Sequence, residues 1–253
     1  MSDSPAELTP ARRLFESTLQ RLGAALTLSE AHGDGGGPWR VLQSHAPFHQ
    51  GACGDARIFT APTMFKIVTC SITAPAIGLD SHMLFAFTSS QSAVPHFTVD
   101  SVQNGDHMAF HLDLIPRLDL ATHLPYMDWA FAGVNDAFTA AASMEGLTPA
   151  HISPRQRAVM SPWMVVNRAT REAFDRVGPL VHVYLDHWLG LLSTGAPEIA
   201  LGGASVGDLA ARDKANKAII FDPDVDKVWN QIRGLIGGEA VEAIRAQLLQ
   251  TSA

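Results

Sequence analysis

The chain has 253 residues, 47% of them hydrophobic and 17% charged, so it is long and apolar enough to bury a sizeable core. Its formal net charge of −7 argues against binding duplex nucleic acid, because phosphate contacts require a surplus of Lys and Arg. The longest apolar runs are strand-sized and the first residues are polar, so we expect a cytoplasmic protein with no membrane span and no signal peptide.

An amphipathic helix is predicted near the N-terminus, within residues 1–30. Thr9 is a suitable N-cap, and Pro10 is a suitable residue for the first helical position. Apolar residues then recur with the spacing of a helix that packs one face on a core. They are Leu14, Phe15, Leu19, Leu22 and Leu26.

Residues 39–115 are predicted to form a sheet. Short segments rich in Val, Ile, Phe and Thr follow one another there, separated by Gly, Pro or Asn and by no helix-length segment, so consecutive strands should pair as an antiparallel meander. Residues 120–250 have mainly helical periodicity. This order predicts an α/β/α sandwich, in which helices flank a central antiparallel sheet on both faces, in a single domain of residues 1–253.

The segment 94–114 predicts a β-hairpin whose polar side chains are histidines and aspartates. With a two-residue turn at Asn104-Gly105, Asp100 lies opposite Ala109. Strand alternation then gathers the polar residues on one face of the hairpin. The same register opposes Thr98 to His111 and His96 to Asp113, with His107 beside them.

This polar row has two interpretations. In a sandwich both sheet faces are covered, and burying carboxylates without partners is costly, which favours a pocket with its own hydrogen-bond partners. A small Ala109 opposite Asp100 would leave open space for a ligand. The alternative is a solvated outer face on an edge hairpin, and the pattern alone favours neither.

Other kinds of site are disfavoured by spacing. Cys53 and Cys70 form no C-x-x-C motif and are interpreted as reduced, buried thiols. Among the 11 histidines, His182 has i,i+4 spacing to Asp186, which suits a shared metal, but such pairs are far more often ordinary surface residues. No G-x-S-x-G motif occurs. We therefore expect neither a metal site nor a Ser-His-Asp centre.

Three segments resemble the ferredoxin-dependent bilin reductases and their relative, red chlorophyll catabolite reductase. In residues 94–120, a Pro-x-Phe-x-x-Asp strand precedes a hairpin partner that ends in Asp-Leu-Ile-Pro. Residues 161–168, SPWMVVNR, resemble the segment whose terminal arginine meets a substrate propionate. In residues 212–240, an Asp-Lys pair precedes a helix that ends at Gly, as in the family's C-terminal block. The resemblance spans roughly residues 40–250, with the blocks in the family's order.

The resemblance implies the same sandwich, with a linear tetrapyrrole such as biliverdin or a chlorophyll catabolite bound between the sheet and the C-terminal helices. It also implies reduction through radicals, with single electrons from reduced ferredoxin, protons from the protein, and no bound flavin, metal or nicotinamide. Asp100 matches the sheet carboxylate that contacts the pyrrole nitrogens and donates a proton, and Asp226 matches the second carboxylate, across the substrate. Arg168 and Lys227 match the cations that hold propionate groups.

The chain departs from the family at two polar positions. Phycocyanobilin-forming members carry a catalytic histidine at the position of Met83, and His82 lies one residue away, where strand alternation points it to the other face. These members also use a glutamate on the preceding strand, which has none here. Four-electron reduction to phycocyanobilin is therefore not expected. His82 and His111 are both candidate catalytic residues, and His96 and Thr98 are candidate substrate contacts.

Docking of ferredoxin predicts a basic surface patch. Candidates for it are Arg117, Arg155, Arg157, Arg168, Arg212, Lys214 and Lys217. Two other functions stay open. One is a non-catalytic tetrapyrrole-binding protein, which would need the cations but not the acids. The other is recruitment of the same fold for another aromatic substrate, with oxygen-dependent chemistry.

Overall fold

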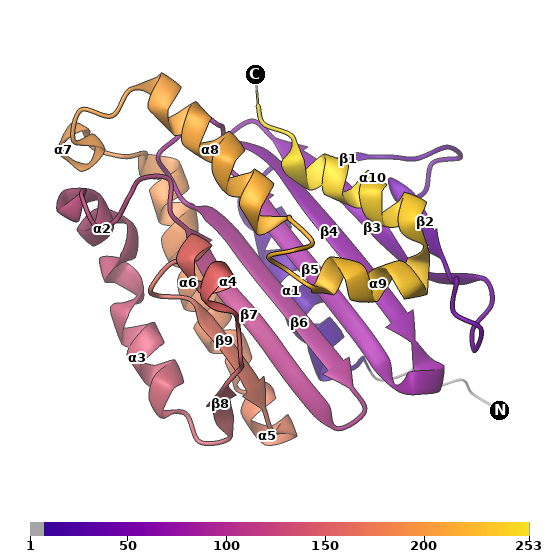
Figure 1. The fold of residues 1–253 in the computed structure, drawn as a ribbon. Coiled ribbons are helices and arrows are strands. Elements are labelled where there is room, and N and C mark those ends of the chain that lie inside the picture. Colours follow the sequence, from indigo (N-terminus) through magenta and orange to yellow (C-terminus); the bar gives the residue numbers. More distant parts are fainter. Residues whose placement is uncertain (1–7, 253) are drawn as a thin grey trace.

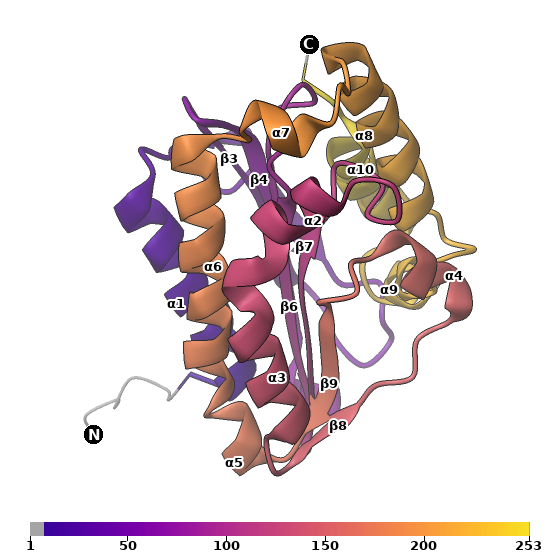
Figure 2. The same cartoon turned by 90° about the vertical axis from the view of Figure 1, so that its left-hand side faces the viewer.

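The computed structural model describes residues 8–252, which form a large sheet between two layers of helices (Figures 1 and 2). Its strands lie in the order β1-β3-β4-β5-β6-β7-β9-β8, with β2 also paired to β3, and all pairs are antiparallel. The strands are β1 (Ser29–Ala31), β2 (Arg40–Gln43), β3 (Ala52–Ala61), β4 (Met64–Ala74), β5 (Leu79–Phe87), β6 (His96–Asn104), β7 (His107–Ile115), β8 (Leu147–Pro149) and β9 (Val165–Ala169).

The helices divide between the two faces of this sheet, which confirms the predicted sandwich. Seen along the sheet in Figure 2, α1 (Pro10–Ala25) and α6 (Val177–Thr194) lie on one side, and α8 (Val206–Ile220), α9 (Val228–Ile236) and α10 (Gly238–Leu249) lie on the other. The remaining helices are α2 (Leu124–Phe131), α3 (Asn135–Ser143), α4 (Pro154–Val159), α5 (Arg171–Phe174) and α7 (Glu198–Leu201), with short 3-10 turns η1 (Pro75–Ile77) and η2 (Ala132–Val134).

Helix α1 begins where its cap residues predict. The Thr9 side chain accepts a hydrogen bond from the backbone N–H of Arg12, and Pro10 starts the helix. Leu14, Phe15 and Leu22 are buried in the core on that side of the sheet, while the other two predicted leucines pack against its margin. The predicted helical region began at residue 1, and residues 1–7 lie outside the described part of the chain.

The meander from β3 to β7 is confirmed, because each of these strands pairs with the next one in sequence. Three strands were not predicted: β1, β8 and β9. Two of them are only three residues long, too short for an alternating pattern. Strand β9 falls in the segment 161–168 and pairs with β7, so that segment lies beside the hairpin.

The hairpin register differs from the predicted one. Strand β6 continues through Asn104 and the turn is at Gly105-Asp106, where Gly105 has a φ of 59°. The N–H of Gly105 also donates to the carbonyl of Gly78, at 3.0 Å. Each residue of β6 therefore pairs with a β7 residue two positions later than predicted. Because the shift is even, every side chain stays on the predicted face of the sheet. The corrected pairs are Asp100 with His111, Thr98 with Asp113, and His96 with Ile115.

The last predicted helical segment, residues 226–249, is two helices. Gly237, with a φ of 81°, ends α9 and caps α10. Among residues 8–252, no helix is long and apolar enough to cross a membrane.

Each sheet face packs against a core of its own. On the α1 and α6 side, the buried residues include Phe97, Val99, Phe110 and Leu112 of the hairpin. On the α8, α9 and α10 side, a second core includes Phe85, Phe221 and Trp229. The polar row of the hairpin faces this second side.

Candidate active site

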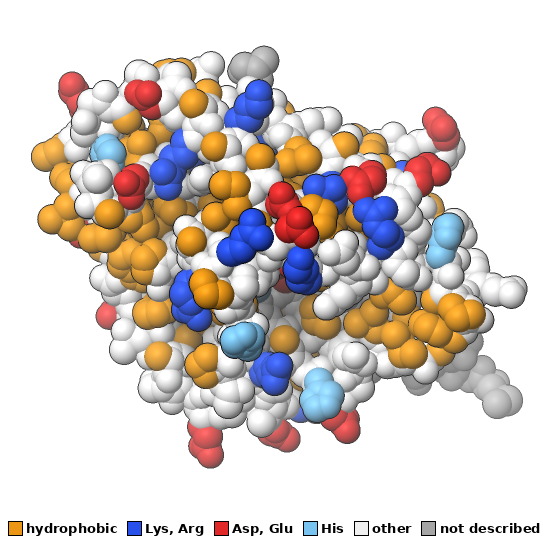
Figure 3. Space-filling view, in the orientation of Figure 1, with side chains coloured by type: hydrophobic (Ala, Val, Ile, Leu, Met, Phe, Trp, Pro, Cys, Tyr) orange, Lys and Arg blue, Asp and Glu red, His pale blue; other side chains and the backbone are white. Residues whose placement is uncertain are grey.

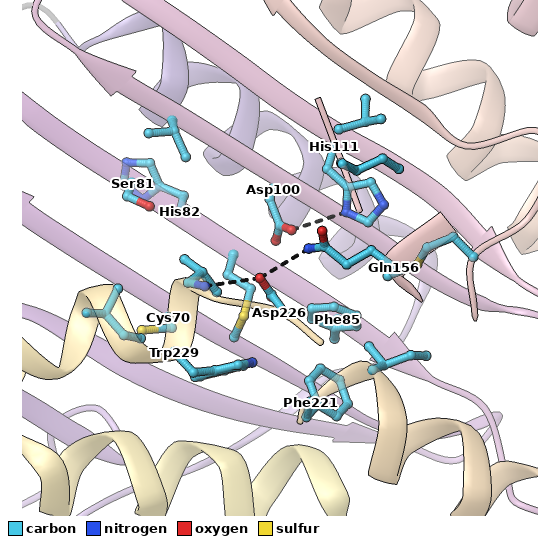
Figure 4. A pocket seen from close by; sticks show the side chains of 18 of the residues that line it. Cys70, Ser81, His82, Phe85, Asp100, His111, Gln156, Phe221, Asp226 and Trp229 are labelled. Atoms are coloured by element: carbon cyan, nitrogen blue, oxygen red, sulfur yellow. Dashed lines mark hydrogen bonds and ion pairs between the residues drawn. The ribbon is translucent and has the colours of Figure 1, made fainter. Parts of the chain in front are cut away.

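A cavity of about 250 Å³ lies between the sheet and the C-terminal helices. Strands β4, β5, β6, β7 and β9 supply its floor, and residues from α4, the end of α8 and α9 close it from the other side. Figure 4 shows Asp100 and His111 reaching into it from the sheet and Asp226 from the segment before α9. Two segments that are far apart in the sequence thus bring carboxyl groups to one cavity.

Asp100 and His111 form a pair on the floor of this cavity. They are opposed on β6 and β7, and Nδ1 of His111 lies 3.3 Å from Oδ2 of Asp100. On the β5 side, the residue opposite Asp100 is Met83. Within the described chain, Asp100 Oδ1 and His111 Nε2 are buried without hydrogen-bond partners. Both atoms are therefore available to a ligand, since buried polar atoms normally have partners.

His111 is surrounded by acidic groups that favour its charged form. Burial lowers the pKa of the imidazole, but the hydrogen bond to Asp100 and the charges of Asp113 and Asp226 outweigh this and raise it above its usual value. Asp113 is itself buried, and accepts hydrogen bonds from the backbone N–H of Ser161 at 3.0 Å and from its hydroxyl at 2.5 Å. These two hydrogen bonds hold β7 against the segment that leads into β9.

Asp226 approaches the cavity from the other side. Its Oδ1 accepts from the backbone N–H of Val228 at 3.1 Å and from the side-chain amide of Gln156 at 3.4 Å. Gln156 is held in place because its Oε1 accepts from the N–H of Ser153, in the capping box that begins α4. Burial raises the pKa of Asp226, and the nearby charge of Asp100 raises it further. A neutral carboxylic acid therefore persists here to higher pH than at the surface.

The remaining walls are mostly apolar and aromatic. Phe85, Phe221 and Trp229 line them, and Phe221 packs edge-on against the other two rings. Nε1 of Trp229 is buried without a partner in the described chain. Cys70 also lines the cavity, and burial raises the pKa of its thiol to about 12, so it stays protonated. Such walls suit a flat, largely apolar ligand that carries a few polar atoms.

Two of the predicted site residues on the hairpin lie away from the cavity. Nε2 of His96 is 2.7 Å from Oδ1 of Asp213, in a buried charged cluster with Arg117 and Lys217. Thr98 is fully buried opposite Asp113, and its hydroxyl has no partner in the described chain. Neither residue lines the cavity.

His82 on β5 is among the residues that line the cavity. Its imidazole, however, lies on the opposite face of the sheet. The ring stacks on Phe15 of α1 at 4.9 Å, and Nδ1 lies 2.9 Å from the hydroxyl of Ser71. Nε2 lies 2.9 Å from Asp80, whose pKa falls because the bonds from His82 and Thr9 outweigh its burial. Strand alternation decides this side, since His82 pairs with Ser101 and not with Asp100.

The predicted cations Arg168 and Lys227 lie near the cavity without lining it. Arg168 is exposed and is paired with Ala109, so it shares the sheet face of His111. Lys227 follows Asp226 directly, and its ammonium is 3.3 Å from Asp224.

The predicted basic patch is corrected at two positions. Arg117 and Lys217 are each 1% exposed, because both are drawn inward by the buried carboxylate of Asp213. The other candidates are at least partly exposed. Figure 3 shows Lys and Arg side chains gathered over α4, α8 and the start of α9.

Sequence reasoning missed Gln156, Met160 and the aromatic wall. The pattern Ser153-x-x-Gln156 is a capping-box signature and could have located the start of α4. Nothing in it indicates that the same amide reaches a carboxylate 70 positions away. Among the described residues, no cluster of three or more His, Cys, Asp or Glu could hold a metal ion.

Comparison with known proteins identifies a structural relative. No protein-family model matches the chain, and no curated protein matches its sequence. The fold matches the crystal structure of selenomethionine phytochromobilin synthase from tomato in complex with biliverdin, with a TM-score of 0.67 and 14% sequence identity. The match covers 94% of this chain and 82% of the tomato protein. At this identity the likeness establishes the fold alone.

Proposed function

We propose that this protein reduces a linear tetrapyrrole, either a biliverdin-like bilin or a chlorophyll catabolite, with single electrons from reduced ferredoxin. One observation carries the proposal: carboxyl groups from two separate segments, Asp100 and Asp226, enter one apolar cavity from opposite sides. That arrangement suits a conjugated chain lying between them. The fold shared with a protein crystallised with biliverdin supports this choice of ligand.

Proton supply is the chemical task of these residues. Reduction of one double bond takes up two electrons and two protons, and each electron added to the conjugated system makes it more basic. A carboxylic acid with a raised pKa, such as Asp226, holds a proton at a pH where an exposed aspartate has lost it. His111 is charged to a higher pH than usual and can pass a proton to Asp100. Acids on both sides would decide which carbon is protonated.

Binding would rely on the aromatic walls and on the cations beside the cavity. Arg168 shares the sheet face of His111, and its guanidinium fork suits a propionate carboxylate. Lys227 would act as a point charge next to Asp226. We expect no resident flavin, metal or nicotinamide, and we expect ferredoxin to dock over the basic side chains around α4 and α8 (Figure 3).

The test is an anaerobic assay with purified protein and biliverdin. Ferredoxin, its reductase and NADPH are then added, and the visible spectrum is followed. Conversion that requires all components supports the reductase. Binding without conversion, with biliverdin and also with a red chlorophyll catabolite, would contradict it and favour a binding protein. Conversion in air without ferredoxin would instead favour oxygen-dependent chemistry.

A further inference from the structure

A second pocket, of about 480 Å³, lies outside the cavity described above, between α4, α8 and the segment from Pro116 to Met127. Its walls are apolar at Leu120, Met127 and Pro162, among others. Two guanidinium groups border it, Arg157 from α4 and Arg212 from α8. It is hereafter the arginine pocket.

The two arginines lack the anions that normally accompany such groups. Among residues 8–252, neither guanidinium has a hydrogen-bond or ion-pair partner, and Nε of Arg212 is buried in that state. Asp119 also borders the pocket, but its carboxylate accepts from the backbone N–H of Ala121, at 3.1 Å, and pairs with neither arginine. A buried donor without a partner is destabilising, and a bound anion would accept hydrogen bonds from these guanidinium groups.

The electrostatic surroundings favour an anion as well. Arg117 is buried close by, and its pKa is lowered by burial and further by the charge of Arg212. Asn216 adds a neutral amide, whose Nδ2 donates to the carbonyl of Pro116 at 3.5 Å. Arg117 is itself paired with Asp213, which is shared with His96 and Lys217, so Asp213 leaves the charges of Arg157 and Arg212 without a paired anion within residues 8–252.

The arginine pocket also adjoins the central cavity. Met160 lines both of them, at the end of α4. Helix α4 turns Gln156 toward the cavity and Arg157 toward the pocket. Likewise Ile220, at the end of α8, borders the cavity, while Asn216 and Arg212, about one and two turns earlier, border the pocket. A substituent that passed Met160 would lead from one space into the other.

We propose that the arginine pocket is a second binding site, which takes a carboxylate carried on an apolar body. Two sources share this chemistry. One is an acidic side arm of the tetrapyrrole in the central cavity, which would then extend here and not to Lys227, whose ammonium pairs with Asp224; this source rests on the proposed function. The other is a separate organic acid, which does not.

The experiment compares paired ligands on matched variants. The wild-type protein, Arg157→Ala, Arg212→Ala and the double variant are titrated with biliverdin and with its dimethyl ester, which lacks the carboxylates. A second titration uses decanoate and its uncharged analogue decanol. Lys214→Ala, an exposed cation on α8 outside the pocket lining, is the control for net charge. Thermal unfolding verifies that each variant folds, and Arg157 is exposed, so its variant should fold normally.

Loss of a charge-assisted contact should weaken binding by roughly tenfold or more. If the side arm is the source, the double variant binds biliverdin about tenfold or more weakly than wild type does, and its affinity for the diester is unchanged. If a separate acid is the source, decanoate binding falls in the same way and biliverdin binding does not. Failure of wild-type protein to bind biliverdin would remove biliverdin as a ligand of the central cavity, and the decanoate titration alone would then test the arginine pocket. The pocket proposal is overturned if neither titration shows a loss that depends on both the carboxylate and the arginines.

Discussion

The imidazole of His111 lies 3.3 Å from the carboxylate of Asp100, across the β6–β7 pair. On the other side of Asp100, strand β5 presents Met83. The partner of this carboxylate therefore comes from the strand that follows it in the chain, not from the strand that precedes it. Protons supplied by the pair would reach a bound ligand from the β7 side of the cavity.

Asp100→Asn should leave tetrapyrrole binding within a few-fold of wild type and lower turnover by roughly 10²-fold or more, since asparagine keeps the shape but donates no acidic proton. Anaerobic mixing with biliverdin and reduced ferredoxin, followed by absorbance and electron paramagnetic resonance, should reveal an accumulating radical. Unchanged turnover would remove Asp100 from the chemistry.

His111→Gln should change the pH dependence of turnover. The raised pKa of His111 means that wild-type activity is full while the imidazole is charged and falls as the pH rises through that pKa, above 6.5. The glutamine variant should be slower, by roughly 10²-fold, and should lack this alkaline decline. Turnover measured between pH 5.5 and 9 tests this.

His82→Gln is the matched control for that variant. Its ring stacks on Phe15 and bonds to Ser71 on the other sheet face, so the variant should lose about 1–3 kcal/mol of unfolding free energy. Turnover per folded molecule should keep the wild-type pH profile. A normal profile for the His111 variant and an altered one for His82 would reverse their assignments.

Asp226→Asn should stabilise the protein increasingly as the pH rises. The pKa of Asp226 is raised in the folded state, so wild-type folding loses free energy as the pH rises from its ordinary 3.8 through the folded value. Asparagine retains an oxygen for the N–H of Val228 and avoids this cost. Urea unfolding measured at pH 4 and pH 7 should show that the unfolding free energy of the variant, relative to wild type, is higher at pH 7 than at pH 4. Turnover should fall in the variant. An equal difference at both pH values would contradict the raised pKa.

Arg168→Ala should weaken biliverdin binding by roughly 10- to 100-fold, the value of one or two charge-assisted hydrogen bonds. Arg168→Lys should be intermediate, because lysine keeps the charge without the guanidinium fork. Arg171→Ala is the control, since α5 packs on the other sheet face through Phe174 and Phe110. Equal effects of the Arg168 and Arg171 variants would indicate a general charge effect only.

Local chemistry explains which elements the sequence could predict. The start of α1 depends on Thr9 and Pro10 alone, and the strands of the meander depend on their own β-branched and aromatic residues. The side of the sheet that Asp100 faces follows from alternation, which holds for any even shift in register. All of these were correct.

Distant contacts explain what could not be predicted. Asn104-Gly105 and Gly105-Asp106 both satisfy a two-residue turn, and the choice between them involves the bond from Gly105 to Gly78, in the loop before β5. That single step changes the residue opposite Asp100 from a small Ala109 to His111. His96 is likewise engaged by Asp213, 117 positions away, which no local pattern indicates.

Asp213→Asn should be among the most destabilising substitutions outside the cavity. The carboxylate is buried and bonds to His96 at 2.7 Å and to Lys217 at 3.0 Å, with Arg117 at 3.4 Å. Removing it leaves buried cations without an anion, which costs about 3–5 kcal/mol of unfolding free energy. Burial opposes ionisation, but these partners lower the pKa of Asp213 to about 2.

The pH dependence of that loss identifies its cause. Because the folded pKa lies below the ordinary value of 3.8, the contribution of Asp213 is present above pH 3.8 and disappears as the pH falls toward 2. The difference in unfolding free energy between wild type and variant, measured by urea unfolding, should therefore become smaller at acid pH. Asp186→Asn, which breaks the exposed pair with Arg21 at 2.6 Å, is the control and should cost at most about 1 kcal/mol. Similar losses for the two variants would mean that Asp213 does not neutralise the buried cations.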